Sequence, residues 1–246
     1  MSRAVKQACR LLHSAIEKHR LIEDGETVIV GFSGGADSLC LLHLLAHYSS
    51  HNRKNWHIVA VHVDPGFPEW NSTRIERLCR SLELSCTVIK LDIPGRTKTS
   101  TLNPCHVCSR ERRKALFETA ARLGARRIAL AHHMEDVNET LLMNLLYTAS
   151  LAAILPCQSL FKGRLDIIRP LYYFDKPLIR ACLRQQRLRP VRLRCPHERT
   201  SARVRLRRFL ERLYRQNRRI RTNLFWGLHN PKPDYLPTRG RPHSLP

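Results

Sequence analysis

The stretch VIVGFSGGADSLCLLHLL, Val28 to Leu45, places a β-branched run before two glycines and a leucine-rich run after them. The first run predicts a buried strand, and the second predicts a helix that begins near Ser38. The glycines between them let the backbone turn sharply and approach a ligand closely. The start of a helix carries unpaired N–H groups and a partial positive charge, so we expect this turn to bind a phosphate.

Further strands and helices alternate along the chain. Strands are expected over residues 28–32, 58–63, 86–91, 126–133 and 165–171, and helices over residues 5–20, 38–48, 73–82, 105–124 and 137–150. Residues 93–104, with their Gly, Pro, Ser and Thr, are typical of a loop. The alternation predicts an α/β fold with an open parallel sheet and helices on both faces. Ligands of such sheets bind beyond the carboxyl ends of the strands, where we expect the glycine turn, the DPG after the second strand and the AHH at the fourth.

The balance of charges indicates a polyanionic partner. The 246 residues include 43 Lys and Arg against 20 Asp and Glu, for a formal net charge of +23. Nucleic acid is the usual partner of such a chain, and the alternative is a basic protein that stays soluble by repulsion. From Arg184 to Arg221 arginine recurs every few residues, and only Glu198 and Glu211 are acidic. We therefore expect these residues to form helices that bind a phosphate backbone, and not helices whose charged face is merely solvated.

The same change of character divides the chain into parts. We expect a nucleotide-binding catalytic domain over residues 1–183 and an arginine-rich RNA-binding extension, packed on it, over residues 184–230. The proline-rich tail over residues 231–246 is expected to be disordered.

Cysteine usage indicates a reducing compartment. The nine cysteines are an odd number, the first residues lack the features of a secretory signal, and no apolar run is long enough to span a bilayer. We therefore expect a cytoplasmic protein without a membrane partner, whose cysteines are thiols or metal ligands. Cys105 and Cys108 form a C-x-x-C pair at a helix start, which favours thiolates, and Cys195 lies in the basic region. The others stand among apolar residues and are expected in the core: Cys9, Cys40, Cys79, Cys86, Cys157 and Cys182.

The glycine turn differs from two common phosphate loops. SGGADS lacks the G-K-[ST] ending of a Walker A loop and the G-x-G-x-x-G of a dinucleotide fingerprint. It resembles the PP-loop, the S-G-G-x-D-S signature of the ATP pyrophosphatase superfamily, whose fold is of the adenine nucleotide alpha hydrolase type. Amides and hydroxyls of four residues can wrap a pyrophosphate there: Ser33, Gly34, Gly35 and Ser38. A carboxylate beside phosphates needs a cation between them, so Asp37 is expected to bind Mg²⁺ next to ATP.

Four motifs, taken in order, make the resemblance specific. SGGADS, PCHVCSRERR, LAHHMEDVNETLLMNLLY and IIRPLYYFDKPLI resemble the TtcA family of tRNA 2-thiocytidine synthetases, which are related to the tRNA(Ile)-lysidine synthetases. The resemblance covers most of the chain. It implies an ATP-dependent tRNA sulfurtransferase that adenylates a pyrimidine carbonyl oxygen, releases pyrophosphate and replaces that oxygen with sulfur. The expected partners are tRNA and a sulfur donor such as a cysteine desulfurase, and a homodimer is a further expectation.

The resemblance also implies an iron–sulfur cluster. It implies a [4Fe–4S] cluster held by Cys105, Cys108 and Cys195, with one iron left free to bind sulfur. In the family the third cysteine usually has a cysteine neighbour, whereas C-P-H stands here. A zinc site formed by these three cysteines and His197 is the alternative.

Further residues are expected near ATP and the activated base. Arg112 and Asp136 match positions that act near the adenylated base in related thiolases. His132 and His133 end an expected strand at the ligand edge, so we expect them to contact ATP or substrate. Asp64, after the second strand, is expected to reach the ribose or adenine, and a role in the turn before the next proline explains it equally well.

The sequence departs from the family pattern at one position, and two alternative functions are considered beside the sulfurtransferase. The family's GHHxDD is AHHMED here, so Glu135 keeps the charge of an aspartate on a longer arm. A lysidine synthetase-type amine ligase, which needs no cluster, is the alternative enzyme. A non-catalytic RNA-binding protein with a degenerate nucleotide site is the third class, and the intact Asp37 and Ser38 argue against it.

Overall fold

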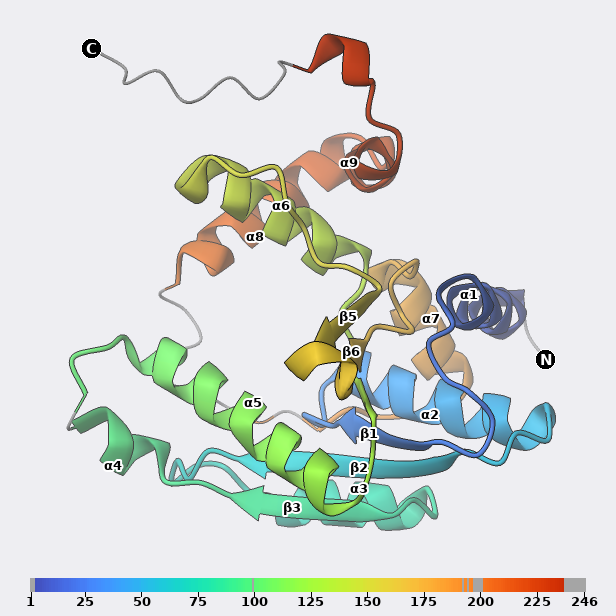
Figure 1. Cartoon of the computed structure of the whole chain (residues 1–246), viewed down its shortest axis with the longest axis vertical. Helices are drawn as coiled ribbons and strands as arrows, with labels where there is room; N and C mark the ends of the chain where they lie inside the picture. The colour runs from blue at the N-terminus through green and yellow to red at the C-terminus, as the bar shows by residue number, and fades with distance from the viewer. Residues whose placement is uncertain (1–2, 99, 192, 194, 197–200, 237–246) are drawn as a thin grey trace.

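A six-stranded sheet runs through the molecule (Figure 1). The computed structural model describes residues 3–98, 100–191, 193, 195–196 and 201–236. The strand order is β3-β2-β1-β4-β6-β5, with β5 antiparallel to β6 and the other neighbours parallel. The strands are β1 (Thr27–Gly31), β2 (His57–Asp64), β3 (Cys86–Lys90), β4 (Arg127–Ala129), β5 (Cys157–Leu160) and β6 (Leu165–Ile168).

Helices cover both faces of the sheet, and a further group lies beside it (Figure 1). The apolar residues of α1, α2, α3 and α7 share one core, and α5 packs on β1, β2 and β4 over a second core. α8 and α9 pack on α6, away from the sheet. The helices are α1 (Arg3–His19), α2 (Ala36–His51), α3 (Thr73–Ser81), α4 (Ile93–Lys98), α5 (Pro104–Arg122), α6 (Met134–Thr148), α7 (Lys176–Gln185), α8 (Ala202–Gln216) and α9 (Arg219–His229).

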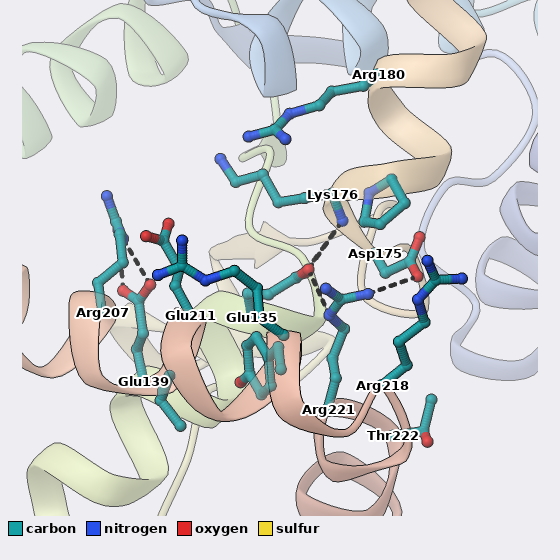
Figure 2. Close-up of a pocket in the computed structure, with 14 residues that line it drawn as sticks. Glu135, Glu139, Asp175, Lys176, Arg180, Arg207, Glu211, Arg218, Arg221 and Thr222 are labelled. Atoms are coloured by element: carbon teal, nitrogen blue, oxygen red, sulfur yellow. Dashed lines mark hydrogen bonds and ion pairs between the residues drawn. The ribbon is translucent and has the colours of Figure 1, made fainter.

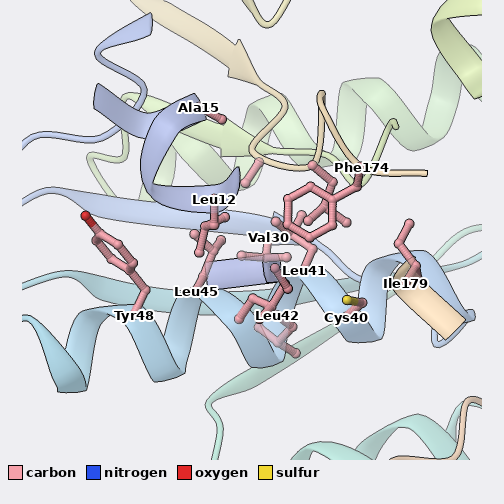
Figure 3. Packing of buried hydrophobic residues seen from close by; sticks show 14 of the residues in the cluster. Leu12, Ala15, Val30, Cys40, Leu41, Leu42, Leu45, Tyr48, Phe174 and Ile179 are labelled. Atoms are coloured by element: carbon pink, nitrogen blue, oxygen red, sulfur yellow. The ribbon is translucent and has the colours of Figure 1, made fainter. Parts of the chain in front are cut away.

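The alternation of side chains along β1 explains the two cores. Val28 and Val30 belong to the larger core together with Leu12 of α1 and Leu41 of α2 (Figure 3). Ile29, between them, belongs to the smaller core beneath α5. Successive side chains of a strand point to opposite faces, so a strand covered on both faces is apolar throughout. This geometry accounts for the uninterrupted apolar run before the glycine turn.

The predicted α/β fold with its largely parallel sheet is confirmed, with local differences. The loop expected over residues 93–104 begins with α4, because an Asp92 side-chain oxygen accepts the Gly95 amide (2.8 Å) and caps its first turn. The edge strand β5 was not expected. It is a short hairpin strand whose turn, Phe161–Gly163, has left-handed backbone at each residue.

Two further boundaries differ from the expectations. The fourth strand ends at Ala129, so His132 and His133 lie beyond the edge of the sheet. The arginine-rich segment forms the separate helices α8 and α9, after α7 has continued to Gln185. Within the tail expected to be disordered, Pro233–Tyr235 forms a short 3₁₀ helix, and residues 237–246 lie outside the described residues.

A buried ionic cluster joins β4 and β6 near the amino ends of the strands. Arg127 and Asp166 are 6 % and 2 % exposed, and the Arg127 guanidinium donates to the Asp166 carboxylate. The Nε of Arg127 also donates to Glu26 (3.2 Å), and the Ser159 hydroxyl donates to the Asp166 carboxylate. Removing one partner of such a pair leaves a buried charge without compensation, which is strongly destabilising.

Asp166→Ala is therefore expected to lower the free energy of unfolding by about 3–5 kcal/mol, measured by urea denaturation. Glu118→Ala is the matched control, because its pair with Lys114 (3.7 Å) is exposed on α5. We expect the control to change stability by less than about 1 kcal/mol. Equal effects of the two substitutions would contradict the assignment of the buried cluster as a structural element.

Candidate active site

The glycine turn joins β1 to α2 and is closed by its own hydroxyls. Ser38 Oγ accepts from the Ser33 amide (3.2 Å) and donates to the Gly35 carbonyl (3.1 Å), and Ser33 Oγ accepts from the Gly35 amide (3.3 Å). Gly34 has φ +78°, and a Cβ there would lie 2.3 Å from Ile75 Cδ1, so only glycine fits. No side chain caps the start of α2, so its first amides are available to an anion.

Asp37, on the first turn of α2, faces two cationic side chains. The Lys176 ammonium lies 3.0 and 3.3 Å from its two carboxylate oxygens, and His133 Nε2 lies 3.6 Å from Oδ1. Burial alone would raise the pKa of Asp37, but the interactions with His133 and then Lys176 outweigh it and lower the pKa to about 2. The carboxylate is therefore ionised at neutral pH, as a ligand for a divalent cation must be.

His133 is a buried imidazole surrounded by three carboxylates. Besides Asp37, its Nδ1 lies 3.2 Å from Asp136 Oδ2 and 3.4 Å from Glu135 Oε2. Burial lowers the pKa of His133, but Asp37, Asp136 and Glu135 together raise it above the ordinary value of 6.5. The Asp136 side chain also accepts a hydrogen bond from the His133 amide (3.1 Å). This hydrogen bond closes the first turn of α6.

This arrangement predicts a titration that can be measured. The folded-state pKa of His133 is raised, so its cation adds stability below pH 6.5 that is lost as pH rises through the folded pKa. Asp37→Asn removes one of the three carboxylates and is expected to lower the NMR titration midpoint of His133. His19, whose pKa is lowered by burial and by Lys18 and His229 rather than by Asp37, is the control and should keep its midpoint. An unchanged His133 midpoint would contradict the assigned contact.

The pKa of His132 shifts in the opposite direction. Arg169 Nε donates to His132 Nδ1 (3.2 Å), and the same guanidinium donates to the Leu155 carbonyl (2.6 Å). Burial lowers the pKa of His132 to about 4, with the nearby Asp136 opposing this and Arg169 adding to it. His132 is therefore neutral at pH 7 with its proton on Nε2, which makes that atom a hydrogen-bond donor.

The carboxylate of Asp64 makes two contacts within its own loop. Oδ1 accepts the Gly66 amide (2.8 Å), and Oδ2 accepts the Ser72 hydroxyl (2.5 Å). Both contacts agree with the alternative explanation of Asp64 given above, which is a structural role in the turn before the next proline. The neighbouring His62 was not singled out from the sequence. Its Nδ1 donates to the Phe32 carbonyl (2.8 Å), directly before the glycine turn, while Trp70 Nε1 donates to its Nε2 (3.0 Å).

Cys105, Cys108 and Cys195 lie near enough to one another for the charge of Cys195 to act on the other two thiols. Cys105 and Cys108 lie on the first turns of α5, where the Asn103 side chain accepts the Cys105 amide (2.9 Å). Burial raises the pKa of both thiols, and the proximity of Cys195 raises it further. Among the described residues, no group of three or more His, Cys, Asp or Glu is placed so that it could hold a metal ion, so the three expected cysteine ligands do not form a metal site in this structure. His197, the fourth ligand of the alternative zinc site, lies outside them.

Arg112 lies near one of these thiols, and the segment before Cys195 contacts the glycine turn. The positive charge of Arg112, one turn after Cys108 on α5, opposes the rise in the pKa of that thiol. After α7 the Val191 amide, which precedes Cys195 along the chain, donates to the Gly34 carbonyl (2.9 Å).

A cleft of about 840 Å³ opens between α6, α7, α8 and α9 (Figure 2). Its basic side chains are Lys176, Arg180, Arg207, Arg215, Arg218 and Arg221. Its acidic side chains are Glu135, Glu139, Asp175 and Glu211. Lys176 lines the cleft and also contacts Asp37, so its side chain links the cleft to the first turn of α2.

Sequence reasoning missed the roles of Lys176 and of Glu135. Glu135 accepts the Lys176 amide (3.0 and 3.2 Å) and lies 3.0 Å from Arg221 Nε. The longer arm that replaces the family aspartate therefore joins α6 to the start of α7 and to α9. A signal for Lys176 was present, because it follows β6 at the ligand edge and stands directly after a helix-capping residue, Asp175.

A parallel α/β sheet with a Ser-Gly-Gly-Ala-Asp-Ser turn at its carboxyl edge defines the PP-loop class of nucleotide-binding proteins. The model of the PP-loop domain family matches residues 4–213. The tRNA-cytidine(32) 2-sulfurtransferase of Syntrophotalea carbinolica is 32% identical over 240 residues, which are 95% of this chain and 92% of that protein. The Geobacter sulfurreducens protein of the same name is 32% identical over 227 residues, 90% and 88% of the two chains. This chain belongs to the tRNA-cytidine(32) 2-sulfurtransferase family of PP-loop proteins.

Solved structures show the same fold. The U34-tRNA thiolase NcsA from Methanococcus maripaludis, described with its [4Fe-4S] cluster, superposes with a TM-score of 0.77 at 20% identity, over 92% of this chain and 78% of that one. The NH₃-dependent NAD synthetase from Campylobacter jejuni superposes with a TM-score of 0.54 at 18% identity, over 98% and 100% of the two chains. None of the helices in the described part of the chain is long and apolar enough to cross a membrane.

Proposed function

We propose that this chain is an ATP-dependent tRNA sulfurtransferase that adenylates the carbonyl oxygen of a cytidine and replaces it with sulfur. One observation carries the proposal: the Val191 amide, which precedes Cys195 along the chain, donates to the Gly34 carbonyl of the glycine turn (2.9 Å), and the charge of Cys195 acts on Cys105 and Cys108. These contacts support a site in which a phosphate-activating loop and a set of thiols act on the same base. The curated relatives, named for sulfur transfer to tRNA cytidine, support the same reaction.

ATP is the nucleotide that membership of the PP-loop family implies. Its phosphates are proposed to lie on the glycine turn, against Ser33, Gly34, Gly35 and Ser38, with Mg²⁺ held by Asp37. The neutral His132 offers Nε2–H as a donor at this edge. His133 acts through Asp37, whose charge it balances. We keep Asp64 as a proposed ribose or adenine contact, although its carboxylate already makes two loop contacts.

The first step activates the base. The cytidine carbonyl oxygen attacks the α-phosphorus of ATP, the bond from that phosphorus to the bridging oxygen breaks, and pyrophosphate leaves. Negative charge builds on the α-phosphate during the attack, where the cation at Asp37 and the amides of α2 stabilise it. Lys176, with its ammonium 3.0 Å from Asp37, adds a second positive charge at this point.

The second step replaces the oxygen. Hydrosulfide, at the oxidation level of sulfide, forms a bond to the activated ring carbon, the bond from that carbon to oxygen breaks, and AMP leaves with the former carbonyl oxygen while the sulfur loses its proton. Arg112 is proposed to stabilise negative charge beside Cys108, and Asp136 to act near the adenylated base, where it also fixes His133. These two roles are part of the proposal.

Three thiols without a histidine or carboxylate among them fit an iron–sulfur cluster by their chemistry. Cys105, Cys108 and Cys195 would hold a [4Fe–4S] cluster, and zinc is the less favoured occupant. When bound, the cluster supplies one iron without a protein ligand, at which a sulfur atom can be carried to the base. The NcsA thiolase, described with its own [4Fe-4S] cluster, supports this assignment through its shared fold.

The remaining expectations belong to the same proposal. They are a sulfur donor such as a cysteine desulfurase, a homodimer, and a cytoplasmic location. We also propose that the chain is divided into three parts: a catalytic part over residues 1–183, an RNA-binding extension over residues 184–230, and a tail over residues 231–246.

The test uses protein purified without oxygen, unmodified tRNA transcripts, ATP, Mg²⁺ and a sulfide source. We expect AMP and thiolated cytidine to form in equal amounts, both dependent on tRNA. Free lysine added to a parallel reaction separates the alternatives, because a lysidine synthetase would attach it to the tRNA. Lysine attachment, or tRNA binding without any AMP, would each overturn the proposal.

A further inference from the structure

The arginines that line the cleft fall into two groups. Arg207 and Arg221 are committed to carboxylates of the protein. Arg207 donates to both oxygens of Glu139 (2.6 and 2.9 Å), and Arg221 lies 3.0 Å from Glu135 and 3.2 Å from Asp175. These pairs join α8 and α9 to α6 and to the start of α7. They hold the wall of the cleft in place.

The second group consists of Arg180, Arg215 and Arg218. All three are exposed and line the cleft, and none of them forms an ion pair within the described ranges. Arg180 lies on α7 one turn after Lys176, and Figure 2 shows it on the side of the cleft opposite Arg218. Arg207 and Arg215 lie on α8, and Arg218 stands at the start of α9, after the extended Asn217.

The charge balance of the cleft selects the kind of ligand. Glu135, Glu139 and Asp175 are already paired with arginines, which leaves Glu211 as the one lining carboxylate without an ion pair among the described residues. Three uncommitted guanidinium groups therefore face one uncommitted carboxylate. Guanidinium groups bind phosphate oxygens in a bidentate manner, so a chain of phosphates suits these positions.

We propose that Arg180, Arg215 and Arg218 form a clamp for the RNA phosphodiester backbone on either side of the target nucleotide. The clamp rests on the proposed function, because tRNA is its ligand. Lys176 lies between the clamp and Asp37, so a strand held there presents its base to the phosphate loop. Arg207 and Arg221 shape the clamp without contacting the RNA.

The test compares two triple variants. Arg180→Gln, Arg215→Gln and Arg218→Gln together remove the clamp. Arg205→Gln, Arg208→Gln and Arg212→Gln remove the same charge from exposed positions of α8 that do not line the cleft. Binding of a labelled tRNA is measured against salt concentration, and ATP binding is measured separately, which also reports on folding.

We expect the clamp variant to bind tRNA at least about 10-fold more weakly, and its salt slope to fall by about 2–3, since each lost phosphate contact removes roughly 0.7–0.9 from the slope. The control variant should keep most of its tRNA affinity and most of its salt slope. The affinity for ATP should be unchanged in both variants. Weakened ATP binding in the clamp variant alone would assign the arginines to the triphosphate and overturn the clamp. Equal loss in both variants would show that only net charge matters and would also overturn it.

The clamp and the function can fail separately. If the clamp variant binds and thiolates tRNA like the unaltered protein, the clamp is wrong and the sulfurtransferase stands. If the unaltered protein does not bind tRNA, both are wrong.

Discussion

Asp37→Asn is expected to abolish tRNA-dependent AMP formation, with a loss of at least about 10²-fold in rate, because it removes the anionic ligand for the cation at the phosphates. Asparagine keeps the shape of the side chain and leaves the Lys176 ammonium without its carboxylate partner (3.0 Å). We expect tRNA binding to be retained, since Asp37 lies outside the clamp.

The control for this substitution is Asp234→Asn, which removes the same charge from an exposed position far along the chain. It should leave AMP formation unchanged. Raising the Mg²⁺ concentration provides a second readout, because a weakened cation site regains part of its activity at higher Mg²⁺. Full activity of the Asp37→Asn protein at low Mg²⁺ would contradict the role assigned to this carboxylate.

Cys105→Ala is expected to remove iron and acid-labile sulfide from protein purified without oxygen and to reduce thiolation below detection. Adenylation should survive, measured as exchange of labelled pyrophosphate into ATP in the presence of tRNA, because the glycine turn and Asp37 are unchanged. Cys108→Ala and Cys195→Ala should behave alike. Loss of thiolation with adenylation retained would indicate that the cysteine is a cluster ligand, whereas loss of both activities would indicate that the variant has not folded.

Cys157→Ala is the matched control, because Cys157 lies on the edge strand β5 rather than at α5. It should retain iron, sulfide and thiolation. Zinc in place of iron would assign the thiols to a structural site. Loss of metal only in the Cys105 and Cys108 variants would show that Cys195 is not the third ligand.

The local sequence predicted the elements that depend on near neighbours. β1, the glycine turn and α2 follow from an apolar run, two glycines and a leucine-rich helix, because both faces of β1 are covered. The same reasoning missed β5, whose four residues pair only with a strand formed later in the chain. It also missed α4, which depends on a single cap from Asp92.

The site shows the same limit. The pKa values of the adjacent His132 and His133 shift in opposite directions, because burial dominates at the first and nearby carboxylates, Asp37 among them, outweigh burial at the second. Their contacts with Arg169 and Asp37 are distant in sequence. Lys176 meets Asp37 across 139 positions, which no local pattern reports. Charge counting indicated the arginine-rich region, but only the ion pairs separate structural arginines such as Arg207 from uncommitted ones.

The central claim is that this site activates a base carbonyl and exchanges its oxygen for sulfur. The most direct measurement uses tRNA whose cytidine carbonyl carries heavy oxygen and follows that oxygen by mass spectrometry of the AMP and the nucleosides. We expect heavy oxygen to appear in AMP in the same amount as sulfur appears in cytidine. Thiolated cytidine accompanied by unlabelled AMP would contradict it.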